Sequence, residues 1–267
     1  MPGHKVTTGY SKNGLPYARV EGGKRTLFII DGLDFSHKPP SRFEMMLFGF
    51  IKKLNDEFTV YLVRRKAGLP AGYSLKDMSD DYAVMIENEI GRPVDVMGIS
   101  TGGTIAQHFG ADHPELISRL ILVMTGHRLT ENGKLLQWHV AGLTRQGKWR
   151  SAAALMATSM FTGVALTLFK AIFWLMGKMM FGSPAGPSDG IVEIEAEDAH
   201  DFKARLTEIT VPTLVIGGDS DFFYPLRETA EGIPGARLVL YEGVGHTAIM
   251  KRRFGADVMA FLDETSG

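Results

Sequence analysis

Short apolar runs alternate with segments of helical periodicity along most of the chain. Several of these runs are apolar at every position, as expected for strands that are covered on both faces of a sheet. Alternation of such strands with helices predicts a mainly parallel sheet with helices on both sides. The predicted strands span residues 17–20, 26–31, 58–64, 93–97, 119–125, 212–217 and 236–241.

Helix signals lie between the predicted strands. Ser74 and Asp77 have the spacing of a capping box and begin a helix that reaches about residue 90, where glycine and proline follow. Two further helices are predicted over residues 101–111, directly after a strand, and over residues 249–262 near the carboxyl end.

The alternation of strands and helices stops between residues 126 and 206, where the composition is helical and no strand is indicated. We therefore expect residues 1–125 and 207–267 to form one doubly wound α/β core, with residues 126–206 as a helical insertion. Within this insertion, residues 164–181 are apolar almost all round a helix. Such a helix is expected to bury more than one face.

Composition and charge narrow the class of protein. The 267 residues are 45% hydrophobic and 22% charged, which is enough to bury a full core. The net charge is −1 and the basic residues are scattered, so we expect no nucleic-acid partner. The absence of cysteine excludes disulfides, a thiol nucleophile and a cysteine-ligated zinc. Nothing in the sequence indicates a metal or an organic cofactor.

One stretch approaches the length of a membrane span. Residues 151–169 contain no charged residue, but serines and threonines dilute the segment, and Lys170 and Lys178 interrupt the apolar run on its carboxyl side. We expect a buried or half-buried helical insertion and no stable membrane span. The amino-terminal residues lack the apolar core of a signal peptide, so a cytoplasmic location is expected. We expect the protein to be a monomer or a homodimer.

A candidate nucleophile lies where an apolar strand runs into a helix. Residues 98–102 read Gly-Ile-Ser-Thr-Gly and fit the pattern G-x-S-x-G around Ser100. On a sharp strand-to-helix turn the serine is exposed in a strained backbone, and side chains two residues away would collide with the strand and helix. The alternative is a glycine-rich turn with an ordinary serine, so the rest of the chain must supply the base and its partner.

His246 is the best placed of the eight histidines to act as that base. It follows the last predicted strand, and loops at the carboxyl ends of parallel strands converge on the side where Ser100 lies. An acid that orients this histidine should follow a strand on the same side. The loop after the strand 212–217 offers two carboxylates, Asp219 and Asp221.

These motifs together resemble the α/β-hydrolase family, in its branch of serine carboxylesterases and cofactor-free haloperoxidases. The resemblance rests on the turn at Ser100, the pattern Gly-x-x-Asp-x-x-x-Pro over residues 218–225, the pair Gly245-His246, and His-Pro-Glu at 113–115. The motifs span nearly the whole core and occur in the family's chain order of serine, acid and histidine.

The resemblance assigns roles to the candidate residues. It implies that Ser100 attacks a carbonyl carbon, that His246 accepts the serine proton, and that Asp221 orients the imidazole. Asp219 is then a turn former. The resemblance also implies a helical cap between the sixth and seventh strands of the core, in the place of residues 126–206.

Two backbone amides are implied as the oxyanion hole, those of Thr101 and Leu33. Many relatives carry His-Gly-x at the second position, whereas this chain carries Asp31, Gly32 and Leu33. The change puts a carboxylate beside a site that stabilises negative charge. We expect Asp31 to turn away and bond to the backbone of its turn, while Asp34 either faces the pocket or caps the next loop.

The expected substrate is a small to medium lipophilic ester or lactone, bound under the cap and cleaved through an acyl-enzyme on Ser100. Ordinary cap core is the alternative role for any single lining residue. Perhydrolysis as in haloperoxidases, hydrolysis of a C–C bond, or a ligand receptor with slow turnover are alternative functions for the same residues. The candidate lining residues are His127, Phe161, Phe169, Phe173, Trp174, Met176 and Phe222.

Overall fold

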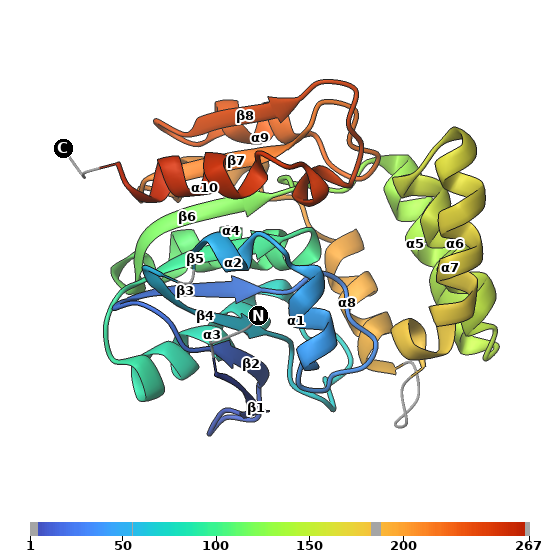
Figure 1. Ribbon diagram of the computed structural model, residues 1–267, viewed down its shortest axis with the longest axis horizontal. Coiled ribbons are helices and arrows are strands. Elements are labelled where there is room, and N and C mark those ends of the chain that lie inside the picture. Colours follow the sequence, from blue (N-terminus) through green and yellow to red (C-terminus); the bar gives the residue numbers. More distant parts are fainter. Residues whose placement is uncertain (1–4, 55, 183–187, 265–267) are drawn as a thin grey trace.

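An eight-stranded, mostly parallel sheet forms the centre of the computed structural model, which describes residues 5–54, 56–182 and 188–264 (Figure 1). The strand order is β1-β2-β4-β3-β5-β6-β7-β8, and only the pairs β1–β2 and β2–β4 are antiparallel. The strands are β1 (Val6–Tyr10), β2 (Pro16–Val20), β3 (Arg25–Ile30), β4 (Phe58–Val63), β5 (Val94–Ile99), β6 (Ile117–Val123), β7 (Thr213–Gly218) and β8 (Arg237–Tyr241).

Helices cover both faces of this sheet and bury one apolar cluster on each. Residues of α3, α4 and α9 pack on one face, and residues of α1, α2 and α10 pack on the other. Every residue of β5 and β7 is buried, which explains their continuous apolar sequences. These helices are α1 (Arg42–Leu47), α2 (Ile51–Leu54), α3 (Leu75–Met85), α4 (Thr101–Asp112), α9 (Leu226–Gly232) and α10 (Phe254–Leu262).

The predicted strands of the core are confirmed, whereas the helices α1, α2 and α9 were not predicted individually. All seven predicted strands occur, and the missed strand is the edge strand β1, whose exposed and half-buried residues give no apolar run. The predicted helix over residues 249–262 is wrong at its start. A 3-10 turn over Ala248–Met250 precedes the exposed basic run 251–253, and α10 begins only at Phe254.

The segment between β6 and β7 contains the helices of the cap. Figure 1 shows α5, α6 and α7 as a layer beside the core, with α8 running between that layer and the sheet. In the contacts of these helices α7 packs against α6, α6 packs against α5, and α5 packs against α8. The helices are α5 (Glu131–Arg145), α6 (Trp149–Met160), α7 (Gly163–Phe181) and α8 (Ser188–Asp198).

The prediction that residues 164–181 bury more than one face is wrong. Only Gly177 and Phe181 of α7 are buried, because most of its contacts with other described helices are made with α6. The uncharged stretch 151–169 is also divided between α6 and α7, with a break at residues 161 and 162. The described residues contain one helix, α7, that is long enough and apolar enough to cross a membrane, judged by length and composition alone.

Candidate active site

Ser100 sits in the turn between β5 and α4 in a backbone conformation that L-residues rarely adopt. Its φ is 52° and its ψ is −123°, so the residue is strained in the way expected of a serine on a tight strand-to-helix turn. Its amide donates to the carbonyl of Val123 on β6, at 2.9 Å, which ties the turn to the neighbouring strand.

Glycine on either side of Ser100 allows the turn to pack. A Cβ at Gly98 would come within 2.6 Å of the Ala106 side chain, and a Cβ at Gly102 would come within 2.3 Å of the Ile30 carbonyl oxygen. Both contacts are shorter than atoms tolerate, so neither position accepts a side chain. The start of α4 therefore lies directly against the end of β3, next to the loop that follows it.

The structure brings Ser100, His246 and Asp221 into one hydrogen-bonded chain. Ser100 Oγ lies 3.0 Å from His246 Nε2, and His246 Nδ1 lies 2.9 Å from Asp221 Oδ2. The His246 and Asp221 side chains are buried, and the Phe223 ring packs edge-on against the imidazole at 4.8 Å. The aspartate thereby favours the histidine tautomer that can accept the serine proton at Nε2.

The two aspartates of the β7 loop have different partners. Asp221 Oδ1 accepts the backbone amides of Phe223 and Tyr224, at 2.9 and 3.1 Å, which fixes the carboxylate beside the imidazole. Asp219 is exposed, and its Oδ1 accepts the amide of Gly243 at 2.9 Å. The structure thus places Asp219 as a brace between two loops and Asp221 as the partner of the histidine.

The loop after β3 lies next to the serine. A Cβ built on Gly32 would be 3.6 Å from the Ser100 Cβ, so the amide of the following residue, Leu33, is close to the same place. Thr101 opens α4, whose first amides have no acceptor within the helix and carry its positive dipole end. The two residues predicted for the oxyanion hole, Leu33 and Thr101, therefore both lie close to Ser100.

Asp31 turns away from the serine, as expected from the sequence. Its Oδ1 accepts the Gly32 amide at 2.9 Å, and its Oδ2 accepts Arg64 Nε at 2.9 Å. Asp34 caps the next loop through the amides of Ser36 and His37. Although burial alone would raise it, the nearby arginines hold the pKa of Asp34 below its ordinary value.

A buried arginine, not singled out from the sequence, supports this loop from below. Arg65 donates to the carbonyl oxygens of Asp31, at 2.5 Å, and of Gly32, and its guanidinium lies 2.7 Å from Glu193 on α8. Arg65 and Glu193 are essentially inaccessible to solvent. Burial opposes the charge, yet Glu193 raises the pKa of Arg65 above its ordinary value. The cap helix α8 is thereby joined to the oxyanion loop.

A second buried glutamate of α8 lies beneath Thr101. Glu197 accepts the hydroxyls of Thr101 at 3.0 Å and of Tyr224 at 2.5 Å, together with the amide of Gln137 at 2.7 Å. Burial raises the pKa of Glu197, although its hydrogen-bond donors act in the opposite direction. The sequence offered one signal for this role, since Glu193 and Glu197 are one turn apart on the same face of a helix.

The predicted lining residues fall into different environments. His127 is fully buried, with its Nδ1 3.1 Å from the Thr229 hydroxyl, so it belongs to the protein interior. Phe161 stacks on Phe169 at 3.9 Å, and Phe173 meets the Phe161 ring edge-on. The remaining candidates, Met176 and Phe222, are half-buried, whereas Trp174 is 44% exposed.

Phe173 belongs to an apolar cluster that also contains Leu33. The cluster joins Phe35 of the oxyanion loop to residues of the cap helices, including Met156, and Phe35 lies 5.0 Å from the Phe181 ring. Trp174 instead lines a surface hollow together with Lys148, Arg150 and Lys178. Of these two neighbours on α7, Phe173 therefore faces the core and Trp174 faces away from it.

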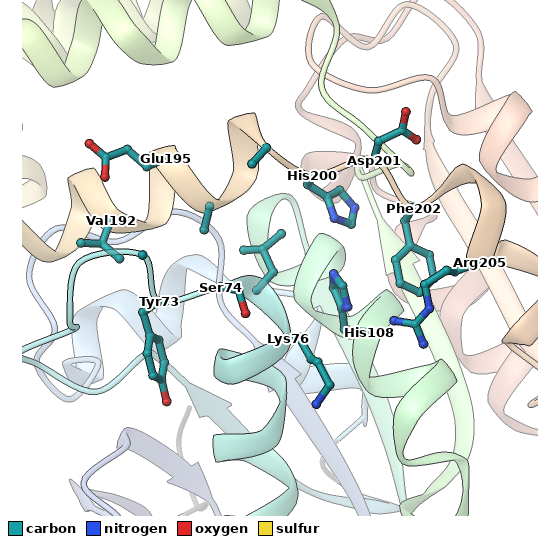
Figure 2. A pocket seen from close by; sticks show the side chains of 14 residues that line it. Tyr73, Ser74, Lys76, His108, Val192, Glu195, His200, Asp201, Phe202 and Arg205 are labelled. Atoms are coloured by element: carbon teal, nitrogen blue, oxygen red, sulfur yellow. The ribbon is translucent and has the colours of Figure 1, made fainter.

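A separate hollow of about 350 Å³ opens between α3, α4 and α8, and contains none of the Ser100 group (Figure 2). His108 and His200 point toward one another in it, with ring centroids 5.4 Å apart, and Phe202 packs beside them. Burial lowers the pKa of His108 to about 4 and that of His200 to about 3. Among the described residues no group of three histidine, aspartate or glutamate side chains is arranged to hold a metal ion.

Comparison with known proteins finds a chloroperoxidase and a hydrolase among the relatives of this chain. The chain is 35% identical over 83 residues to the non-heme chloroperoxidase CPO-A1 of Kitasatospora aureofaciens, covering 28% of this chain and 30% of that protein. It is 30% identical over 187 residues to 2-hydroxy-6-oxononadienedioate/2-hydroxy-6-oxononatrienedioate hydrolase 1 of Dechloromonas aromatica, covering 63% of this chain and 62% of that protein. The chain thus matches less than two thirds of the length of either relative.

Structural similarity extends over nearly the whole chain. The enol-lactonase from Burkholderia xenovorans LB400 superposes with a TM-score of 0.77, covering 97% of this chain and 100% of that one, at 22% sequence identity. The family model of the alpha/beta hydrolase fold matches residues 27–252, from the first parallel strand to beyond His246. The chain belongs to the α/β-hydrolase family, with haloperoxidase-like proteins among its relatives.

Proposed function

We propose that this hydrolase cleaves small to medium lipophilic carboxylic esters or lactones through an acyl-enzyme on Ser100. The observation that carries the proposal is the unbroken hydrogen-bonded chain from Ser100 through His246 to Asp221. It lies in a loop cluster that also holds two backbone amides, those of Thr101 and Leu33, where an oxyanion would form.

The proposed reaction has two halves that use the same atoms. Ser100 Oγ bonds to the carbonyl carbon as its proton passes to His246 Nε2, and the amides of Thr101 and Leu33 stabilise the resulting oxyanion. The imidazolium, stabilised by Asp221, then gives its proton to the departing alkoxide. A water molecule attacks the acyl-enzyme by the same route, which releases the carboxylic acid and restores the serine.

The surroundings of Leu33 favour a neutral substrate over an anionic one. The cluster that contains it is apolar, with contributions from the oxyanion loop and from the cap. The two nearby arginines are already paired: Arg64 contacts Asp31 and Glu44, and Arg65 contacts Glu193. The Dechloromonas relative is named for dioate substrates, and neither arginine here is free to bind a substrate carboxylate. The pairing of both arginines therefore supports an ester or a lactone as the substrate, rather than a dioate that is cleaved at a C–C bond.

A fluorophosphonate probe and a series of p-nitrophenyl esters test the proposal. We expect one covalent adduct on the peptide containing Ser100. The Ser100→Ala variant should form no adduct, and its kcat for ester hydrolysis should be lower by several powers of ten. Ser220→Ala, on an exposed loop residue, is the matched control and should retain both. Labelling that persists in Ser100→Ala would contradict the assignment, and an adduct without turnover of any ester would favour a ligand receptor.

A pair of aspartate variants tests the orienting role. Asp221→Asn removes the carboxylate that fixes the histidine tautomer, and the equivalent change in a serine protease lowers kcat by about 10⁴. Asp219→Asn keeps an oxygen to accept the Gly243 amide, so its kcat should stay close to that of the wild type. A strongly lowered kcat in Asp219→Asn, together with a nearly unchanged kcat in Asp221→Asn, would contradict the proposed roles.

A further inference from the structure

The outer face of α7 carries a stripe of exposed apolar side chains. Val164, Leu168, Leu175 and Met179 are spaced by four, seven and four residues, which places them on one side of the helix. They are 89%, 59%, 68% and 54% exposed. With Trp174 they make five of the eleven large hydrophobic residues that are exposed in the described part of the chain. The exposed apolar surface is thus concentrated on one helix.

This helix lies in the middle of a long segment without any acidic residue. Residues 132–188 contain six lysines and arginines and no aspartate or glutamate, although the whole chain has a net charge of −1. Two of the six are paired with acidic residues of α8, Lys134 with Asp198 and Arg145 with Glu195. The other four, which form no ion pair with a described residue, are Lys148, Arg150, Lys170 and Lys178.

Three of these four cations gather in one hollow beside the apolar stripe. The hollow has a volume of about 420 Å³ and is lined by Lys148, Arg150 and Lys178 together with two indole rings, those of Trp149 and Trp174. The Arg150 guanidinium lies 4.5 Å from the centre of the Trp174 ring. Lysine and arginine beside tryptophan, along an exposed apolar stripe, is the arrangement of helices that lie in a membrane interface.

The connections of α7 exclude a membrane-spanning arrangement in this fold. The helix is preceded by α6 and followed by α8, and both of these pack against α5. The two ends of α7 therefore lie on the same side of any surface that it contacts. A Cβ at Gly177 would come within 2.6 Å of the Arg150 Cα, so α7 is also held tightly along α6. A helix held in this way can lie on a bilayer but cannot cross one.

We propose that the outer face of α7 docks on the surface of a lipid bilayer that contains anionic phospholipids. The apolar stripe enters the boundary between headgroups and acyl chains, and the hollow formed by Lys148, Arg150 and Lys178 receives the phosphate of a headgroup. A second copy of the chain fits this surface poorly, since a two-fold interface would bring the same unpaired cations together. The inference goes beyond the proposed ester hydrolysis and does not depend on it.

Flotation with lipid vesicles tests the apolar stripe. We expect the full-length protein to bind phosphatidylcholine vesicles that contain a third of phosphatidylglycerol, to bind pure phosphatidylcholine at least tenfold more weakly, and to dissociate at high salt. Leu168→Glu with Leu175→Glu should abolish binding. The matched control is Val84→Glu with Met250→Glu, which adds the same charges at exposed apolar positions outside the cap and should lower binding much less.

Charge variants test the second half of the proposal. Replacement of Lys148, Arg150 and Lys178 by glutamine should lower the partition coefficient on phosphatidylglycerol vesicles by about fivefold per residue. The control replaces three exposed lysines outside the cap, Lys24, Lys38 and Lys251, and should have a much smaller effect. Circular dichroism and the melting temperature show whether each variant is folded. The milder pair Leu168→Ser with Leu175→Ser serves if the glutamate pair fails to fold.

Three results would overturn the proposal. The wild-type protein could fail to float with any vesicle, or the stripe variant could float as well as its control. In the third case the wild-type protein sediments as a dimer and binds no vesicle, while the stripe variant sediments as a monomer. That result would assign the stripe to an interface with a second copy of the chain.

Discussion

Two helices of the cap, α7 and α8, reverse the usual relation between composition and burial. Five of the eleven residues of α8 are acidic, and three of these, Asp189, Glu193 and Glu197, are buried. By contrast, α7 is apolar apart from a few positions, yet only Gly177 and Phe181 are buried. The apolar helix lies at the outside of the molecule, and the acidic helix lies between the layer of α5, α6 and α7 and the sheet (Figure 1).

The difference arises from the partners that each helix meets. Each buried carboxylate of α8 has donors supplied by the core: Asp189 accepts the amides of Gly68 and Leu69, Glu193 meets Arg65, and Glu197 meets hydroxyl groups. Burial of charge is tolerated only with such partners. On the outer face of α7, by contrast, Val164, Leu168, Leu175 and Met179 are each more than half exposed. The hydropathy of a segment indicates how much free energy its burial would contribute. It does not indicate whether the fold supplies a neighbour that buries it.

The largest expected effect comes from removing the cation that pairs with Glu193. Arg65→Met leaves the buried Glu193 carboxylate with His37 and the amide of Asp34 beside it but without its cation, and should lower the free energy of unfolding by about 3–5 kcal/mol. Urea denaturation measures the change. Arg145→Met is the matched control, because Arg145 pairs with Glu195 of the same helix at the surface and should cost less than about 1 kcal/mol. Equal costs for the two variants would contradict the comparison.

Loss of stability in acid should come from the histidines beside α8. The pKa of His200 is lowered to about 3 and that of His108 to about 4, so between pH 6.5 and 4 the unfolded chain binds more protons than the folded one. The free energy of unfolding therefore falls with falling pH, by up to about 1.4 kcal/mol per pH unit for each histidine.

A variant isolates the share of His200 in this acid sensitivity. His200→Phe keeps a ring against Phe202 and removes one titrating group, so the slope of stability against pH should become shallower by about one proton. Replacement of the exposed His139 by phenylalanine is the control. An unchanged slope in His200→Phe, measured by urea denaturation from pH 7 to 4.5, would contradict the assignment.

The hydrogen-bonded group of Ser100, Asp221 and His246 could be predicted because each residue lies in a short local motif. Gly98 and Gly102 flank Ser100 in the sequence, and each reports a steric need that the structure shows. The continuous apolar strands were predictable for a similar reason, since each is covered on both faces. Edge strand β1 was not, because its exposed residues lack that signal.

The supporting polar contacts could not be predicted because they join distant segments. Arg65 follows β4, yet it bonds to the loop after β3 and to a helix more than a hundred residues later. In the sequence it stands in the run 64–66, which reads as solvated surface. Its burial, like that of Glu197, depends on which loops the fold brings together.

An intermediate effect is expected at Glu197, whose partners are neutral donors. Glu197→Gln retains the shape but sets an amide NH₂ against hydroxyl and amide donors, so it should cost about 1–3 kcal/mol near pH 5. Burial raises the pKa of Glu197, so the contribution of this side chain to stability is fully present below about pH 4.5 and is lost as the pH rises. The cost of the variant should therefore shrink between pH 5 and 8. A cost that grows over that range would show that the carboxylate is stabilised as an anion.

The smallest expected effect separates the two faces of α7 at adjacent residues. Trp174 is 44% exposed and held mainly by the Arg150 guanidinium, so Trp174→Ala should cost about 0.5–1 kcal/mol and leave the preferred ester chain length unchanged. Phe173 packs in the cluster that contains Leu33, so Phe173→Ala should lower the melting temperature further. If that cluster also bounds the acyl pocket, the same variant should shift the optimum of a p-nitrophenyl ester series toward longer chains. A shift in Trp174→Ala and none in Phe173→Ala would mean that the substrate is bound on the outer face of the cap.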